Sequence, residues 1–300
     1  MSITVCIPTR NRPGDLAECL DSIAASSVAV GETIVADDST DGATRTLTTT
    51  RYPHVTYVDG LRQGLGPNRN RALDAATGEW ILFLDDDARL GVDFLATLAP
   101  FIAADDRRRT IFTGIERQTT ALVFPNDQNF LGFQTVPYKP GAPLNTLVIN
   151  AALFPAALFR TIRFDPQLVY GYDEVDVAMR ARLSGYEIRL CPEAVNRHFP
   201  SQINRGFYGR HTEIARIYVT FKRYAEVERR PFKAVAFIVA SFVHSVAHHL
   251  KTGGVSGVAE AMRTHRAAWR KIALWRASRR SLATAKIPGS IVAPPGPELG

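Results

Sequence analysis

The chain has 300 residues, long enough for one large domain with an appendage. Its hydrophobic fraction of 46% and charged fraction of 22% are those of an ordinary globular protein, which excludes a fibrous or wholly disordered chain. The three cysteines, Cys6, Cys19 and Cys191, lie far apart without metal-binding or redox spacing, which favours a reducing compartment. The first residues predict a strand rather than a signal peptide.

The net charge of +7 is unevenly distributed along the chain. Residues 205–286 hold 17 Lys or Arg and only 4 Asp or Glu, whereas the remainder is acidic. A basic segment of this kind can meet nucleic acid, anionic lipid or an acidic partner. Because no nucleic-acid motif accompanies it, we expect no nucleic acid and favour an anionic membrane surface.

Strand and helix patterns alternate through the first 84 residues. The expected strands are 3–8, 33–36, 55–58 and 80–84, and the expected helices cover 13–23, 43–50 and 64–77. Alternation with short connections predicts an α/β fold with a doubly wound, mostly parallel sheet flanked by helices.

Two of these strands end in acids. The apolar run 81–84 leads directly into the acidic triplet 85–87, and the strand 33–36 leads into the acidic pair 37–38. Adjacent unpaired carboxylates resist burial, so they belong at the rim of the sheet, where ligands of open α/β sheets bind. There they could hold a hard divalent cation, which prefers carboxylate oxygen. The alternative is an acidic turn that only ends a strand.

The middle of the chain is less regular. A helix is expected at 91–104, and residues 110–150 read as a strand or two with loops that shape an acceptor pocket. Residues 150–159 carry Ala and Phe and should return to the core. A short strand is expected at 187–190.

A second acidic stretch begins a predicted helix. Asp173, Glu174 and Asp176 lie in its first turn, where acids are favourable on dipole grounds alone. The functional alternative is that one carboxylate reaches the rim and takes a proton from an attacking hydroxyl. His198, further along, is by itself more often structural than a metal ligand.

Five sequence blocks occur in one order: 5–12, 34–41, 66–73, 78–87 and 171–176. With them, roughly residues 3–200 resemble the family 2 glycosyltransferases of GT-A fold, and the rhamnosyl- and galactofuranosyltransferase-like members in particular. The resemblance implies a GT-A-like sheet and an inverting transfer of a sugar from a nucleotide-diphosphate donor, assisted by Mg or Mn.

The resemblance also implies site residues. Those around the donor would be Pro8, Arg10, Asp38, Arg69 and Asp86. The metal would be held by Asp85 and Asp87, the outer members of the D-x-D pattern, and by His198 where some galactofuranosyltransferases supply a histidine. The family's usual Glu-Asp pair reads Asp173-Glu174 here; its second member is the expected base, so Glu174 is assigned that role with Asp173 as the alternative.

Two other functions remain open at this point. A nucleotidyltransferase also uses acids at a sheet rim, but it usually carries a Gly-rich, basic motif near its first strand, which residues 7–12 do not supply. A non-catalytic sugar-nucleotide-binding scaffold would keep the rim acids and have no need of Glu174. The Gln-x-x-Arg-Trp motif of processive synthases is absent, which favours single transfers.

The basic segment contains two apolar stretches. Residues 207–226 read as a helix, and residues 234–250 carry no Lys, Arg, Asp or Glu. Seventeen residues are the lower limit of a membrane span, so a buried helix, an interfacial helix and a span all remain open. Residues 256–283 read as a basic amphipathic helix or pair, with Trp269 and Trp275 as candidate interface anchors.

These patterns predict three parts. They are a catalytic domain at 1–204, a basic helical extension at 205–286 that associates with a membrane, and a disordered tail at 287–300. The expected acceptor is a lipid-linked or cell-surface glycan. The expected location is cytoplasmic, peripheral at the inner face of the cell membrane.

Overall fold

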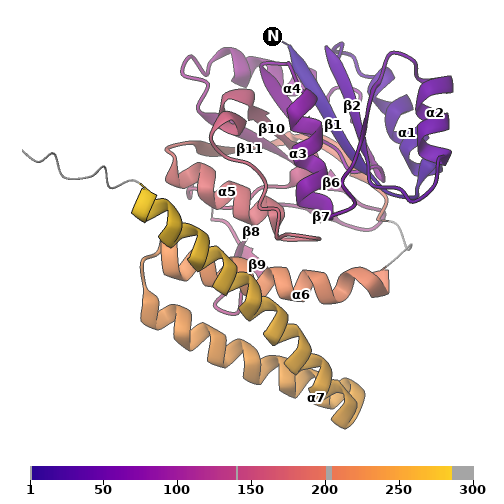
Figure 1. Cartoon of the computed structure of the whole chain (residues 1–300). Coiled ribbons are helices and arrows are strands. Elements are labelled where there is room, and N and C mark those ends of the chain that lie inside the picture. Colours follow the sequence, from indigo (N-terminus) through magenta and orange to yellow (C-terminus); the bar gives the residue numbers. More distant parts are fainter. Residues whose placement is uncertain (1, 140, 201–204, 286–300) are drawn as a thin grey trace, which may run out of the picture.

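A computed structural model describes residues 2–139, 141–200 and 205–285, and the centre of this described part is a mixed sheet of nine strands (Figure 1). The strand order is β3-β2-β1-β4-β10-β6-β11-β5, with β7 paired to β6. The strands are β1 Ile3–Thr9, β2 Glu32–Asp37, β3 Thr56–Asp59, β4 Trp80–Phe83, β5 Ala88–Arg89, β6 Thr110–Arg117, β7 Leu122–Val123, β10 Ala152–Pro155 and β11 Glu187–His198. A separate hairpin joins β8 Asn126–Gln128 to β9 Gln134–Pro137.

The parallel half of the sheet aligns the acidic strand ends. β1 pairs in parallel with both β2 and β4, with Cys6 opposite Ile34 on one side and Phe83 on the other. The acids that follow β2 and β4 therefore emerge at the same edge, on either side of β1. β10 runs antiparallel between β4 and β6. The two-residue strands β5 and β7 are also antiparallel to their neighbours. The predicted mostly parallel sheet is confirmed.

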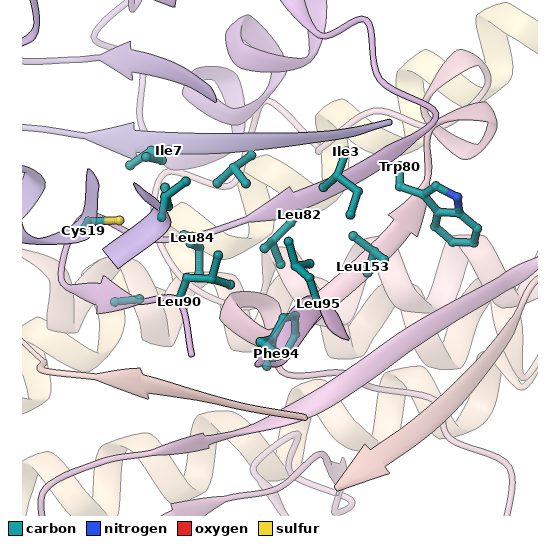
Figure 2. Packing of buried hydrophobic residues seen from close by; sticks show 14 of the residues in the cluster. Ile3, Ile7, Cys19, Trp80, Leu82, Leu84, Leu90, Phe94, Leu95 and Leu153 are labelled. Carbon is teal, nitrogen blue, oxygen red and sulfur yellow. The ribbon is translucent and has the colours of Figure 1, made fainter. Parts of the chain in front are cut away.

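Both faces of the sheet are covered by helices. These are α1 Pro13–Ala24, α2 Ala43–Arg51, α3 Leu65–Ala75, α4 Phe94–Ala103 and α5 Asp173–Leu183, with short 3-10 turns η1 Ile149–Ala151 and η2 Ala156–Arg160. One core places Ile7 and Leu82 of the sheet with Leu95 of α4 (Figure 2). The opposite core places Cys6 and Phe83 with helices α3 and α5. Burial on both faces explains why β1 and β4 read as continuous apolar runs.

One strand is longer than the sequence predicts. β11 continues past residue 190 to His198 and shifts its register against β6 between Leu190 and Val195. The irregularity accommodates Pro192, which lacks the N–H of a regular ladder. As a result His198 is the last residue of the strand, paired with Ala88 beside the acidic triplet.

The basic segment forms helices that pack below the α/β body (Figure 1). α6 Arg205–Lys222 ends in a π turn, η3 Arg223–Val227, and is followed by α7 Pro231–Ala285. α7 is two arms joined at Gly254, whose φ of 60° and ψ of −149° are not helical. A third core holds the helices together, with Tyr218 of α6 packed among residues of both arms. The tail predicted at 287–300 lies outside the described residues.

A buried charge network joins α5 to α6. The Lys222 ammonium lies 2.9 Å from Asp165 and forms an ion pair with Asp176, which also pairs with Arg180 at 2.6 Å. Burial alone would raise the pKa of Asp176, but the charges of Lys222 and Arg180 outweigh it and leave the pKa below its usual value. Asp176, the third acid of the second stretch, is therefore a structural residue that fixes α6 against α5.

We expect Lys222→Met to lower the free energy of unfolding by about 3 kcal/mol at pH 7, because it leaves a buried carboxylate without its main cation. Urea denaturation measures this loss. The matched control is Lys233→Met. The pair that Lys233 forms with Glu228 is more exposed than the Lys222–Asp176 pair, so this substitution should change the free energy of unfolding by less than about 1 kcal/mol. Equal losses in the two variants would contradict the assignment.

The same pair predicts a pH dependence. A carboxylate with a lowered folded pKa contributes stability above its unfolded pKa of about 3.9, and the contribution disappears as the pH falls through the folded value. The difference between wild type and Lys222→Met should therefore be full at pH 7 and should shrink below about pH 4. A difference that stays constant down to pH 3 would argue against the Asp176 pair.

Candidate active site

A pocket of about 360 Å³ opens at the carboxyl ends of β1, β2 and β4. Its walls come from the segments that follow these strands, from the start of α3 and from α6. Six of the ten residues predicted for the site line it: Pro8, Arg10, Asp38, Asp85, Asp87 and His198. The two acidic strand ends thus meet in one cavity.

The acidic pair after β2 divides into two roles. Asp37 accepts hydrogen bonds from the Tyr57 hydroxyl and the Ser39 backbone, both at 2.8 Å, so it shapes the turn. Asp38 faces the pocket and accepts from the backbone N–H of Arg62 at 2.8 Å. Burial raises the pKa of Asp38. Only glycine suits position 60, because a Cβ there would lie 2.0 Å from Asp38 Oδ1.

Arg69 lies behind the pocket wall and joins two parts of the site. Its side chain is 1% exposed, and its guanidinium carbon lies 5.8 Å from the ring centroid of Phe83 and 5.5 Å from that of Phe164. One terminal nitrogen is 2.7 Å from Asp85 Oδ1, and the other forms an ion pair with Asp173. Asp173 is also buried, so the structure places both residues in the support of the pocket rather than on its surface.

Asp86 does not line the cavity. It is fully buried, and its oxygens contact the Thr9 hydroxyl at 2.7 Å and Arg12 at 3.0 Å. Burial raises the pKa of Asp86 to about 7, although the Arg12 charge opposes the shift. The middle member of the triplet therefore anchors the loop between β4 and β5.

Asp87 and His198 are in direct contact. His198 Nε2 lies 3.2 Å from Asp87 Oδ1, and His198 Nδ1 lies 2.8 Å from Glu116 Oε2. Burial lowers the pKa of His198, but hydrogen bonds with the two carboxylates outweigh it and raise the pKa to about 10. The strand extension past Pro192 is what brings this histidine to the acidic triplet.

The donor set suits a hard or borderline divalent cation. Asp85, Asp87 and His198 all line the pocket. Carboxylate oxygens are the ligands that Mg²⁺ and Mn²⁺ prefer, and an imidazole nitrogen is a ligand of more borderline divalent metals. Within the described ranges, no group of three Asp, Glu, His or Cys side chains is already converged on one point. Instead the carboxylates are paired with the guanidinium groups of Arg12 and Arg69.

The start of α5 presents the remaining predicted residue. Gly171 and Tyr172 both have positive φ, 76° and 59°, and turn the chain sharply into the helix. Glu174 is half-buried beside the Asp85–Arg69 pair, and the Gln134 side chain of β9 donates a hydrogen bond to it. Burial raises the pKa of Glu174. Glu174 itself does not line the pocket, but a carboxylate with a raised pKa next to the pocket-lining Asp85 is a candidate proton acceptor.

The sequence interpretation missed several pocket residues. Arg12 lines the pocket and falls inside the sequence block 5–12, but that block gave it no role. Tyr170 also lines the pocket and lies just before the second acidic stretch. Tyr208 and Thr212 come from α6, which the sequence placed in a separate extension. The rings of Tyr170 and Tyr208 are stacked with centroids 4.1 Å apart. Only the tertiary packing of α6 could reveal this wall.

The chain is similar in sequence to a known protein family and to several proteins of known name. The sequence pattern of the family described as Glycosyl transferase family 2 matches residues 4–162. The chain is similar to a PGL/p-HBAD biosynthesis glycosyltransferase of Mycobacterium bovis, 30% identical over 123 residues that cover 39% of this chain and 48% of the relative. It therefore spans about half the length of the curated relatives it matches.

Two further similarities extend the comparison. A GalNAc(5)-diNAcBac-PP-undecaprenol beta-1,3-glucosyltransferase of Campylobacter jejuni is 33% identical over 101 residues, covering 32% of this chain and 33% of the relative. A mannosyltransferase of Pyrobaculum calidifontis, solved with GDP-Man and Mn²⁺, has a TM-score of 0.55 and 23% identity over 95% of this chain and 81% of its own. This structural likeness confirms the GT-A-like fold.

We expect Arg69→Gln to lower the free energy of unfolding by about 3–5 kcal/mol, because it strips two carboxylates of a buried cation. Arg71→Gln is the matched control on the same helix, since the Arg71 side chain is 39% exposed and its pair with Asp74 is long, at 4.0 Å. The control should lie within about 0.5 kcal/mol of wild type. Chemical denaturation of both variants checks the difference, and similar losses would contradict the bridging role.

Proposed function

The chain belongs to glycosyl transferase family 2, and from this we propose that it transfers a sugar from a nucleoside-diphosphate donor to an acceptor hydroxyl with inversion. The observation that carries the proposal is the convergence of Asp38, Asp85 and Asp87 in one pocket, with Glu174 beside Asp85 on a separate helix. Such an arrangement separates donor binding from proton removal. No second function has an observation of its own in its favour.

The donor would lie along the strand ends. Asp38 can accept from an N–H of the nucleobase, and Pro8 and Arg10 line the cavity around it. Asp85, Asp87 and His198 would hold Mg²⁺ or Mn²⁺, which neutralises charge on the leaving diphosphate. The Pyrobaculum mannosyltransferase was solved with GDP-Man and Mn²⁺, which supports a nucleotide sugar and a divalent cation as the two bound partners.

The acceptor would approach from the side of α5. Glu174 takes the proton of the attacking hydroxyl, and its raised pKa makes it a better base near neutral pH. Gln134 donates a hydrogen bond to it and so fixes its orientation. Direct attack on the sugar carbon needs no covalent intermediate and inverts that centre. The presence of a histidine at position 198 favours the galactofuranosyl- or rhamnosyltransferase-like type.

We further propose a lipid-linked or cell-surface glycan as the acceptor, used at the inner face of the cell membrane. The undecaprenol-linked substrate in the name of the Campylobacter relative supports a lipid-linked acceptor. The helical segment gives independent support. One described helix, Pro231–Arg280, is long and apolar enough by composition to cross a membrane, and only 22% of its most apolar window is buried.

The first arm of α7 exposes an apolar stripe. The stripe consists of Phe232, Val235, Val239, Val243 and Leu250, each between 51% and 89% exposed. Their spacing puts them on one side of the helix, opposite the buried residues that pack on α6. Since one face is held by α6, we propose that the arm lies in the membrane interface rather than spanning it.

Basic groups accompany the stripe. Arg229, Arg230 and Lys233 lie at its start and Lys251 at its end, where they can meet anionic headgroups. Trp269 of the second arm is 52% exposed in the groove between the arms. The other tryptophan expected to reach the interface, Trp275, instead packs edge-on against Phe221 of α6.

The central test is Glu174→Gln. We expect it to lower the rate of transfer at least about a hundredfold while donor affinity stays within about twofold, because the amide keeps the shape but accepts no proton. Nucleotide sugars from a panel, screened by thermal shift with Mn²⁺, supply the donor. Full transfer activity in the variant would overturn Glu174 as the base.

Asp87→Ala supplies the complementary control. It should abolish the metal-dependent part of donor binding, measured by calorimetry with and without EDTA. Tight donor binding without any transfer by the wild-type protein would instead favour the scaffold function.

Membrane association is tested by the double variant Val239→Glu with Val243→Glu. We expect at least about a tenfold loss in binding to vesicles of anionic phospholipid, since each exposed valine contributes about 1.5 kcal/mol or more when buried. Val92→Glu is the control, a 54% exposed valine on the α/β body. Unchanged vesicle binding by the double variant would contradict the proposed membrane association of α7.

A further inference from the structure

Arg12 lines the pocket, but neither the family resemblance nor the similar proteins give this residue a role. It directly precedes α1, and its side chain is 19% exposed in the pocket. One terminal nitrogen lies 2.7 Å from Asp87 Oδ2, and the other lies 3.0 Å from Asp86 Oδ1. A single guanidinium thus holds two adjacent carboxylates.

The backbone next to Arg12 is anchored by its neighbour Asn11. Asn11 adopts a left-handed conformation with φ of 57°. Its N–H donates to Ser39 Oγ at 2.7 Å, and its side-chain oxygen accepts from the Thr40 N–H at 2.9 Å. The loop after β1 is therefore hydrogen-bonded to the loop after β2. These bonds hold the backbone next to Arg12 in place beside the cavity.

Both oxygens of Asp87 already face internal cations. Oδ1 contacts His198 and Oδ2 contacts Arg12. A divalent cation binds a carboxylate oxygen at about 2.0–2.6 Å. At Asp87 it would therefore lie within a few ångströms of the Arg12 guanidinium, where like charges repel strongly. The metal and the arginine cannot both keep their best positions.

We propose that Arg12 competes with the divalent cation for Asp87 and, once the cation has bound, turns to the diphosphate of the donor. The inference rests on the proposed function, because it takes the anionic donor as the second partner of Arg12. Guanidinium and phosphate groups form short, charge-assisted hydrogen bonds, so the diphosphate is a suitable destination. Metal binding and nucleotide binding are then coupled, each favouring the other.

The competition is measured without any donor. Mn²⁺ is titrated into wild type and Arg12→Gln by calorimetry, with free Mn²⁺ followed by paramagnetic resonance. We expect the variant to bind Mn²⁺ about five- to tenfold more tightly, since the competing cation is gone. An arginine with a merely structural role predicts the opposite, a weaker site and a lower melting temperature in every ligand state.

The second half of the inference is measured with nucleotide. UDP and GDP are titrated at saturating Mn²⁺, and Arg12→Gln should bind the preferred one about tenfold more weakly than wild type. Arg12→Lys keeps the charge and should retain the weak Mn²⁺ affinity of wild type. Arg51→Gln, which removes an exposed pair with Asp21, is the control and should change neither affinity.

The outcomes separate this inference from the proposed function. Mn²⁺ affinity that is unchanged or weaker in Arg12→Gln overturns the competition, whatever the nucleotides do. Tighter Mn²⁺ binding that Asp87→Ala abolishes supports it at the intended site. If neither nucleotide binds wild type while Arg12→Gln still gains Mn²⁺ affinity, the competition stands and a uridine- or guanosine-diphosphate donor is ruled out.

Discussion

The site depends on one buried guanidinium. Arg69 of α3 reaches Asp85 after β4 and Asp173 at the start of α5, and so joins three elements that are distant in sequence. Burying such a charge is costly unless it is fully paired, which ties the two carboxylates to fixed positions. Glu174, the next residue after Asp173, is thereby held near Asp85. The proposed base and the proposed metal ligand Asp85 share one support.

The local elements could be predicted because their patterns are strong. Alternating strand and helix signals located β1 to β4, and the acids after β2 and β4 converge because parallel strands end at one edge. His198 was harder to place, since Pro192 suggested that the strand ended early. Its position follows from an irregularity in pairing, which depends on β6 and has no local signal.

The individual roles of neighbouring acids were beyond local prediction. Asp85, Asp86 and Asp87 look equivalent in the sequence, yet one is fully buried and the other two line the pocket. The buried one, Asp86, accepts a hydrogen bond from Thr9, a residue 77 positions away. Likewise Asp176 resembles its neighbours but belongs to the buried pair with Lys222. Such partners are known only once the chain is folded.

The shared position of α6 has a geometric consequence. Its first turns line the pocket through Tyr208 and Thr212, and its later turns form the floor on which both arms of α7 rest. The cavity and the apolar stripe are therefore connected through one packed set of helices. Such a set seated on a bilayer would hold the cavity at a constant height above the lipid headgroups. The helices would then select acceptors by the distance between the acceptor hydroxyl and the membrane surface.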